Sequence, residues 1–341
     1  ILRCYMSCKE HDEKKKKNRF VHTFKSTKYL PVFLWLLILI TTFARSMEQQ
    51  KKIQAGDWVM FTGLSVVWGF SFFFIKKGLE VFQPMQVAAF RMSIAFIALI
   101  PLIMLNYKKL SIPSHKWKYI PLLSLFGNLI PAVLFCTAET KIDSGLTGIM
   151  NSTTPLFALL IGSLFFGVGL TQNKIIGVIV GFVGAIIIVL SKQKGFSGIN
   201  IFILMPLLAT VCYGFNANIF KSNFQTENPV IIALLQYSFA APFTLAYLYY
   251  SGAFHQIQQE PLVAWNSIKY LLMLGAFGTG YALVFFNILI QRTSALFATM
   301  TTYLIPLVSV IVGLLDKESI LPIHLFGLFV ILIGVYIGSR N

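Results

Sequence analysis

One arginine interrupts a long apolar stretch and is the residue best suited to hold a charged or polar ligand. The stretch is WGFSFFFIKKGLEVFQPMQVAAFR, residues 68–91, and Arg91 follows Pro84 by roughly 10 Å at ~1.5 Å per helical residue. If the stretch crosses a membrane, a central charge costs about 2.5–3.5 kcal/mol, so Arg91 should face a cavity or a partner. It either binds a carboxylate, phosphate or carbonyl group of a ligand, or it reaches the interface or helix-end carbonyls.

Two polar clusters that precede a proline interrupt other apolar runs, NSTTP at 151–155 and TTYLIP at 301–306. Proline removes one backbone hydrogen bond and frees a carbonyl, which a hydroxyl or water can satisfy. The clusters predict two bent helices that present side chains and loose carbonyls to a midplane cavity. A plain kink, with Ser and Thr packed between helices, is the alternative.

Aromatic residues one turn from a hydrogen-bonding side chain suit a pocket that grips amphipathic cargo. Two such pairs occur, Trp68 with Ser71 and Tyr213 with Asn216. Interhelical packing explains any single member equally well, and Asn128 and Asn287 carry the same ambiguity. The candidate substrate-binding residues are Trp68, Ser71, Arg91, Asn128, Asn151, Tyr213, Asn216, Gln236, Asn287 and Tyr303.

Residue patterns for catalysis are missing from the sequence. It has no HExxH motif, no pair of mid-span aspartates and no mid-span histidine that could activate a buried serine. No His, Cys or carboxylate cluster has metal-ligand spacing, and no GxxxxGK[ST] loop could hold ATP phosphates. We therefore expect no catalytic residue, no metal, no cofactor and no enzymatic activity.

Acidic residues lie at the ends of the apolar runs, with Glu139 at the end of the third. A carboxylate proton relay through the membrane is therefore poorly supported. The expected energetics are facilitated diffusion, exchange, or export driven by the gradient of the cargo itself.

The composition indicates whether lipid or water surrounds most of this chain. Of 341 residues 56% are hydrophobic and 12% are charged, with a mean hydropathy of +0.74. A soluble domain of this length could not bury so much apolar surface, so we predict an all-α polytopic membrane protein surrounded by a lipid bilayer. The net charge of +16 falls mostly in a basic N-terminal head and between apolar runs, which is typical of membrane-flanking charge and not of nucleic-acid binding.

The first 46 residues differ from the rest, with a lysine-rich head followed by the short apolar run 29–44. Three interpretations remain open: an upstream frame with synthesis from Met47, a cleaved signal, or an extra transmembrane helix. The first is favoured, and the third conflicts with the positive-inside preference because of Lys51 and Lys52.

Ten apolar runs of spanning length follow. We expect spans near 58–75, 84–105, 119–138, 144–166, 174–191, 200–220, 229–250, 269–290, 293–315 and 321–338. Loops between the spans are short and leave no room for a separate extramembrane domain.

The second half of the chain repeats the first. Trp68-Gly69-Phe70-Ser71 aligns with Tyr213-Gly214-Phe215-Asn216, and the same offset of 145 residues takes Pro84 to Pro229 and Arg91 to Gln236. Further on, an offset of 151 takes Phe126-Gly127 to Phe277-Gly278 and Pro155 to Pro306. Each half, 57–191 and 200–340, holds five spans. An odd number predicts an inverted-topology repeat, which transporters use for alternating access around a midplane site.

Charge placement favours cytoplasmic termini, with ten basic residues in the loops and termini that would then be inside against seven outside. The predicted function is transport of a small-molecule cargo across a membrane. A non-transporting scaffold or receptor is the alternative, and an intramembrane enzyme is a less favoured one.

The stretches quoted above, with DSGLTGIMNSTTPLFALLIGSLFFG and TSALFATMTTYLIPLVSVIVGLLDKES, resemble the EamA-type transporters of the drug/metabolite transporter superfamily. The resemblance implies a central cavity lined by the first four helices of each half, with the fifth helix at the periphery. It also implies a cargo such as an amino acid or a drug-like compound, and a prokaryotic inner membrane as the location. The chain differs from the family in lacking a Gly-Glu pair after the fourth helix of the first half, where Gly167-Val168 stands, whereas the second half keeps Glu318.

Small residues form a face on the fifth and the tenth span, namely Gly177, Gly181, Gly184 and Ala185 on one and Gly327, Gly334 and Gly338 on the other. Such faces predict close helix packing. The sequence leaves the oligomeric state open, and these faces are the surfaces through which helices could pack.

Overall fold

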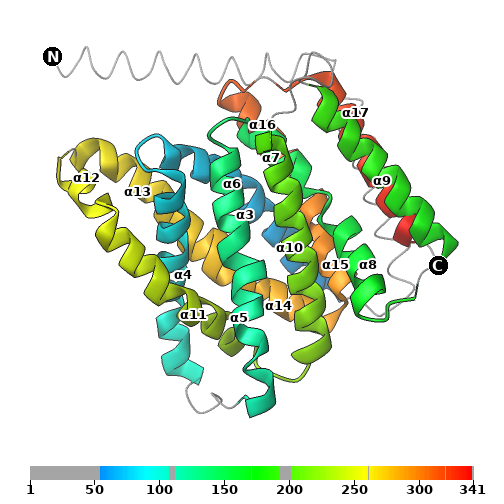
Figure 1. Ribbon diagram of the computed structural model, residues 1–341, viewed down its shortest axis with the longest axis horizontal. Helices are drawn as coiled ribbons and strands as arrows, with labels where there is room; N and C mark the ends of the chain where they lie inside the picture. Colours follow the sequence, from blue (N-terminus) through cyan, green and yellow to red (C-terminus); the bar gives the residue numbers. More distant parts are fainter. Residues whose placement is uncertain are drawn as a thin grey trace. The chain divides into compact units, whose positions relative to one another are not determined.

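The computed structural model describes residues 54–106, 112–169, 171–191, 201–259, 261–318 and 320–339. These ranges form helices and connecting turns and contain no β-strand (Figure 1). The N-terminal segment 1–46, with its three competing interpretations, lies outside the described residues.

The first half forms five spans. They are α3 (Ala55–Leu79), α4 (Pro84–Asn106), a third span that begins with a 3₁₀ turn (Ser114–Lys116) and continues through α5 (Tyr119–Ser124), a π-helical turn (Leu125–Leu129) and α6 (Ile130–Ala138), then α7 (Ser144–Asn151) with α8 (Thr154–Phe165), and α9 (Gln172–Ser191).

The second half repeats this order. Its elements are α10 (Ile201–Asn223), α11 (Pro229–Tyr250), a short α12 (Ala253–Gln259), α13 (Pro261–Gly275) with a π-helical turn (Ala276–Tyr281) and α14 (Ala282–Arg292), then α15 (Ala295–Thr299), a 3₁₀ turn (Met300–Tyr303) and α16 (Ile305–Leu315), and α17 (Pro322–Ser339).

Ten of these helical units correspond to the ten predicted spans. Within the described ranges, nine are long and apolar enough to cross a membrane, and the shorter apolar helix Pro322–Gly334 makes the tenth. The described part of the chain is that of an all-α polytopic membrane protein, with ten transmembrane helices arranged as two inverted five-helix repeats.

Contacts between helix ends show the inversion. Asp57, in the first turn of α3, pairs with Arg292 at the end of α14 (Oδ1 to Nη1, 3.4 Å). Lys221, in the last turn of α10, donates to the carbonyl oxygen of Ile290 in the same end of α14 at 2.9 Å. The start of α3 and the end of α10 therefore lie at one face, so these equivalent helices run in opposite directions.

The eighth span begins earlier than predicted, at Pro261 instead of near residue 269. Asn266 and Lys269 lower the hydropathy of its first turns, but both side chains are exposed. Ala264 and Ser267 lie on the buried side, and Ser267 donates to the Lys77 carbonyl oxygen at 2.8 Å. The exposed side of these turns mixes the two polar residues with Leu262 and Trp265, so the continuous apolar run starts later than the helix does.

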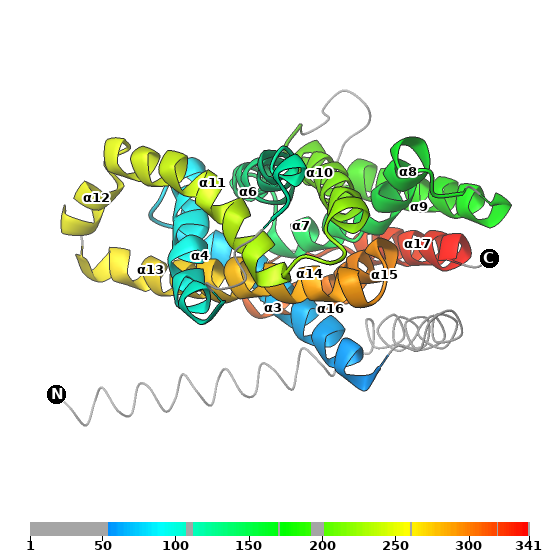
Figure 2. The ribbon, with the colours of Figure 1, turned by 90° about the horizontal axis from the view of Figure 1, so that it is seen from below.

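The two halves pack against each other through two equivalent pairs of helices. The first helix of each half packs against the fourth span of the other, α3 against α16 and α10 against α8 (Figure 2). Glycines permit the approach: a β-carbon at Gly69 would overlap Val308, and one at Gly214 would lie 3.0 Å from the Ala158 backbone nitrogen. The repeated glycine of the WGF and YGF motifs is therefore a contact between the two halves.

Helices α9 and α17 lie side by side along their length (Figures 1 and 2). A β-carbon at Gly184 would lie 2.7 Å from the Gly327 carbonyl oxygen, and one at Gly334 would lie 2.6 Å from the Gly177 carbonyl oxygen. The two small-residue faces are thus packed against each other within the chain.

Candidate functional site

A cavity of about 80 Å³ lies between the two halves. The lining comes from the first four spans of both repeats and from neither α9 nor α17. The lining residues are Trp68, Ser71, Phe72, Ile75, Arg91, Gly127, Asn128, Phe135, Asn151, Thr154, Tyr213, Asn216, Tyr237, Gly278, Thr279, Leu283, Phe286, Thr299 and Thr302. At roughly 10–15 Å³ for each water, this space holds several water molecules.

Two π-helical turns shape opposite walls of the cavity. They occupy equivalent places in the repeats, 125–129 and 276–281, and turns of this kind often mark functional sites. Each brings a glycine against a polar side chain on the first helix of the other half. A β-carbon at Gly127 would lie 2.5 Å from Asn216 Oδ1, and one at Gly278 would lie 2.5 Å from Ser71 Oγ.

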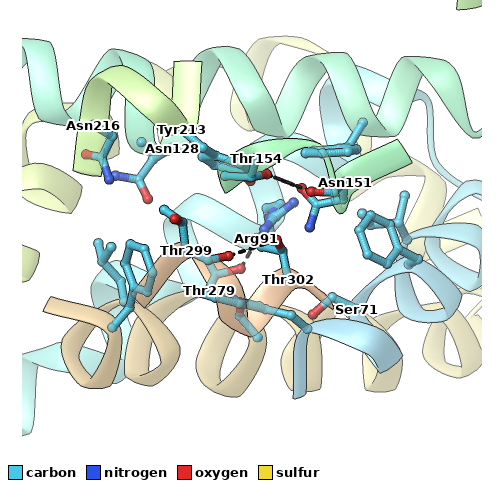
Figure 3. A pocket seen from close by; sticks show the side chains of 18 of the residues that line it. Ser71, Arg91, Asn128, Asn151, Thr154, Tyr213, Asn216, Thr279, Thr299 and Thr302 are labelled. Carbon is cyan, nitrogen blue, oxygen red and sulfur yellow. Dashed lines mark hydrogen bonds between the residues drawn. The ribbon is translucent and has the colours of Figure 1, made fainter. Parts of the chain in front are cut away.

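Arg91 is the only charged side chain among the lining residues, and it is 8% exposed. Its Nε donates to Thr279 Oγ1 at 3.2 Å, and it forms no ion pair with any residue in the described ranges. Thr279 is itself held, because its hydroxyl donates to the Leu274 carbonyl oxygen at 2.8 Å and its carbonyl accepts from Tyr237 at 2.9 Å. Figure 3 shows the guanidinium between Thr279 and Asn151, directed into the cavity.

The fourth span of each half is broken where the sequence predicted a bend. In the first half α7 ends at Asn151 and α8 begins at Thr154; in the second, a 3₁₀ turn separates α15 from α16. The freed carbonyls are not loose as expected. Hydroxyls bond the carbonyl three residues earlier, for example Thr154 to Asn151 at 2.7 Å and Thr302 to Thr299 at 2.8 Å. The breaks therefore offer side chains to the cavity, while their hydroxyls satisfy the backbone.

Seven candidates from the sequence lie together in the lining, namely Trp68, Ser71, Arg91, Asn128, Asn151, Tyr213 and Asn216. Trp68 is fixed there by its Nε1, which donates to the Gly278 carbonyl oxygen at 3.0 Å. Its ring also packs edge-on against Phe286, with centroids 5.2 Å apart.

Three candidates lie outside the lining. Gln236 is fully buried behind it, where its Oε1 accepts from Asn128 Nδ2 at 3.0 Å. Asn287 is also fully buried, and neither atom of its amide has a hydrogen-bond partner among the described residues. Tyr303 is buried because it follows the lining residue Thr302 by one position, which turns it toward another side of the 3₁₀ turn.

Four threonines line the cavity. Thr154 and Thr302 belong to the two polar clusters that the sequence predicted to face it, whereas Thr279 and Thr299 were missed. The repeat offset could have found Thr279, because advancing Asn128 by 151 residues gives this position. Tyr237, Phe135 and Thr299 had no comparable signal, because uncharged side chains are ordinary within a membrane helix.

Charged contacts join several elements at one face of the molecule, beyond the cavity. Lys76, near the end of α3, lies 2.8 Å from Glu318 Oε1 and 2.6 Å from Asp316 Oδ2. The Glu318 carboxylate accepts from Ser144 Oγ at 2.7 Å and from the Gly145 backbone nitrogen at 2.9 Å. We call this set, Lys76 with Glu318 and the start of α7, the Lys76–Glu318 latch. The acid retained in the second half thus ties the two halves together.

Other charged pairs lie at the opposite face. Lys116 pairs with Glu227, and Arg292 pairs with Asp57. Burial alone would raise the pKa of Glu227, but hydrogen bonds from Lys116 and the backbone outweigh it and hold the pKa below 4.5. Glu227 is therefore ionised at neutral pH and keeps its pairing with Lys116.

Known proteins resemble this chain over most of its length. Relatives include a protein of Archaeoglobus fulgidus named an uncharacterized transporter, 24% identical over 83% of this chain and 99% of its own length. The uncharacterized inner membrane transporter YedA of Escherichia coli is 27% identical over 80% of this chain and 87% of its own. A Salmonella typhimurium protein named a probable amino-acid metabolite efflux pump is 25% identical over 80% and 91%, respectively.

A solved crystal structure shares the fold, with a TM-score of 0.58 at 13% identity over 84% of this chain and 97% of that one. The EamA-like transporter family matches twice, at residues 55–190 and 200–340, one match for each half of the structure. The protein therefore belongs to the EamA-like transporter family and is a multi-pass membrane transporter.

Proposed function

We propose that this protein is an alternating-access carrier that moves a small anionic or zwitterionic metabolite, such as an amino acid, through the cavity at Arg91. The observation that carries the proposal is a buried guanidinium without an ion-pair partner among the described residues. Such a charge is costly in a membrane unless something compensates it, and a cargo carboxylate would do so at close range.

The remaining lining narrows the class of cargo. Trp68, Phe72, Phe135 and Tyr213 present apolar and aromatic surface, and none of the lining residues is acidic. A carboxylate on Arg91 with an apolar group among these rings fits this surface, whereas a cationic drug would meet an unpaired positive charge. The name of the Salmonella relative, an amino-acid metabolite efflux pump, agrees with this class.

Ion pairs at both faces of the molecule support the proposal of alternating access. The Lys76–Glu318 latch lies at one face and the Lys116–Glu227 pair at the other. Each of them joins a residue of the first half to a residue of the second. In the proposed cycle, cargo enters or leaves at each face when the contacts of that face open. Two inverted halves around one cavity allow the faces to open in turn.

The test is counterflow of radiolabelled L-leucine and L-phenylalanine in proteoliposomes, with Arg91→Ala, Arg91→Lys and wild type compared. A charge-assisted hydrogen bond contributes about 1.5–3 kcal/mol, so we expect Arg91→Ala to raise the half-saturation concentration about ten- to hundredfold. Arg91→Lys should recover part of this loss, since it restores charge without the planar fork. Lys269→Ala, at an exposed position on α13, is the control and should behave as wild type.

Two results would contradict the proposal. Equal half-saturation concentrations for Arg91→Ala and wild type would make Arg91 structural. Thermal stabilisation of the purified protein by these amino acids, without any flux, would instead indicate a receptor or scaffold.

We also propose an inner-membrane location with both termini cytoplasmic. The face with Lys116, Lys221 and Arg292 then faces the cytoplasm, in agreement with the positive-inside preference. Cysteines introduced at the exposed positions His115 and Lys141, in a background without native cysteines, test this. An impermeant maleimide added to whole cells should label the variant at Lys141 and spare the one at His115; the reverse would overturn the orientation.

A further inference from the structure

The carboxyl group of Glu139 is a buried acid that the proposed function does not use. Glu139 directly follows α6, the last element of the third span, at the face of the Lys76–Glu318 latch. The residue is partly exposed as a whole, but both carboxylate oxygens are covered and neither has a hydrogen-bond partner among the described residues. Covered carboxylates are normally paired or hydrogen-bonded, so an ionised group here would be costly.

Charges surround Glu139 from several elements without pairing to it. Glu318, which follows α16, and Lys76 on α3 belong to the latch, and Arg91 approaches from α4. Helix α10 presents the neutral Tyr213, which stacks on Phe135 one turn before Glu139, with ring centroids 5.9 Å apart. Cys136 on α6 itself is neutral and fully buried.

This position links the latch to the cavity. Phe135 lines the cavity, whereas Glu139, one turn further along the same side of the helix, is within electrostatic range of Glu318. A negative charge on Glu139 would repel Glu318 and compete for Lys76. Loss of the Glu139 proton would therefore weaken the ion pair of the latch, because it would disturb both of its partners.

We propose that Glu139 is a proton-binding site that regulates access to the cavity: the carboxyl group holds a proton while the Lys76–Glu318 latch is closed, and it releases that proton to water when the latch opens. This inference rests on the carrier function proposed above. Glu139 lies at the end of a span, and the sequence alone does not indicate that its carboxylate oxygens are buried there. In the proposed orientation, the pH that controls this face is that of the outer side.

The pH dependence has a definite sign. Burial, and then the charge of Glu318, raise the pKa of Glu139 well above 4.5, although Arg91 and Lys76 act in the other direction. For an acid with a raised pKa, the protonated closed form is favoured at low pH and is lost as pH rises through the pKa of the closed form. Each unit of difference in pKa between the closed and open forms changes the latch equilibrium tenfold.

The first experiment measures L-leucine counterflow at equal pH on both sides, from about pH 5 to about pH 8. We expect the wild-type rate to rise severalfold to about tenfold with pH, and the Glu139→Gln rate to stay near the low-pH value. Glu80→Gln is the matched control, because Glu80 is an exposed acid at the same face, paired to Lys77 at 2.6 Å. It should keep the wild-type pH profile.

A second measurement needs no cargo. Native Cys136 is fully buried one turn before Glu139, so its alkylation in a variant that keeps only this cysteine reports opening of the face. The alkylation rate should rise with pH more steeply when Glu139 is retained than when the same variant also carries Glu139→Gln. A charge on Glu139 acts directly on the thiol in the opposite sense, because it disfavours the thiolate that alkylation needs, so a steeper rise reports opening. Infrared spectra at about pH 5 should show a protonated carboxyl band that Glu139→Gln lacks.

The outcomes separate the two proposals. Counterflow with identical pH profiles in wild type and Glu139→Gln would overturn the proton site and leave the carrier. Absence of counterflow would overturn the carrier for these amino acids, and the alkylation and infrared results would still decide whether Glu139 binds a proton and controls the latch. Equal alkylation profiles and no carboxyl band would reject it.

Discussion

At the scale of single residues, the site depends on how Arg91 is oriented. Its one hydrogen bond to a side chain in the lining goes to Thr279, whose own hydroxyl and carbonyl are fixed by Leu274 and Tyr237. The guanidinium is therefore held at its Nε edge beside the cavity that it lines. Rigid support of this kind reduces the entropy lost when a ligand binds.

Thr279→Val should remove this support without changing the size of the side chain. A neutral hydrogen bond contributes about 0.5–1.5 kcal/mol, so we expect the half-saturation concentration of L-leucine to rise about two- to tenfold with little change in maximal rate. Counterflow kinetics test this. Thr279→Ser keeps the hydroxyl and should restore wild-type values, and failure of the Ser variant to do so would assign the effect to packing.

At the scale of elements, the glycine contacts between halves make a specific stability prediction. A β-carbon at Gly69 would overlap Val308, whereas one at Gly63 on the same helix would have nothing within 4 Å. Overpacking costs about 1–3 kcal/mol, so Gly69→Ala should lower the melting temperature in detergent and slow counterflow. Gly63→Ala is the matched control and should be neutral or slightly stabilising, because alanine favours the helix.

Thermal unfolding measured by intrinsic fluorescence distinguishes the two variants. Equal melting temperatures for Gly69→Ala and Gly63→Ala would mean that the contact between α3 and α16 relaxes freely and does not hold the halves together.

The helices and turns differ in how well the sequence predicts them. Ten spans, the repeat and the helix starts at Pro84 and Pro229 are predictable, because apolar length and proline position are local signals. The π-helical turns are not, since one extra residue in a turn leaves no compositional mark. They change which side of the third and eighth spans faces the cavity, so helical spacing alone does not predict the lining there. The repeat offset, by contrast, leads from Asn128 to Thr279.

At the scale of the whole molecule, the two faces should respond to pH with opposite sign. The pKa of Glu227 is lowered, so its contribution to stability is present above pH 4.5 and is lost as pH falls through its folded pKa. The pKa of Glu139 is raised, so its contribution is greatest below pH 4.5 and is lost as pH rises through its folded pKa. Stability should therefore reach a maximum in mildly acidic solution.

Melting temperatures across this pH range test the assignment. Glu139→Gln should flatten the decline at high pH, and Lys116→Met should flatten the decline at low pH by removing the partner of Glu227. A single variant that flattens both limbs would show that the faces do not act separately.

The seam between α9 and α17 has a consequence for how such a molecule could arise. The same kind of glycine face meets its own equivalent, with Gly184 against Gly327 and Gly334 against Gly177. A contact between like surfaces is self-complementary, so it would also join two copies of one five-helix chain inserted in opposite senses. Consider an ancestral gene of half this length whose five-helix product inserted into the bilayer in both orientations. That product would already have had the surface needed to pair. After duplication and fusion of the gene, each copy had only to keep one of the two orientations.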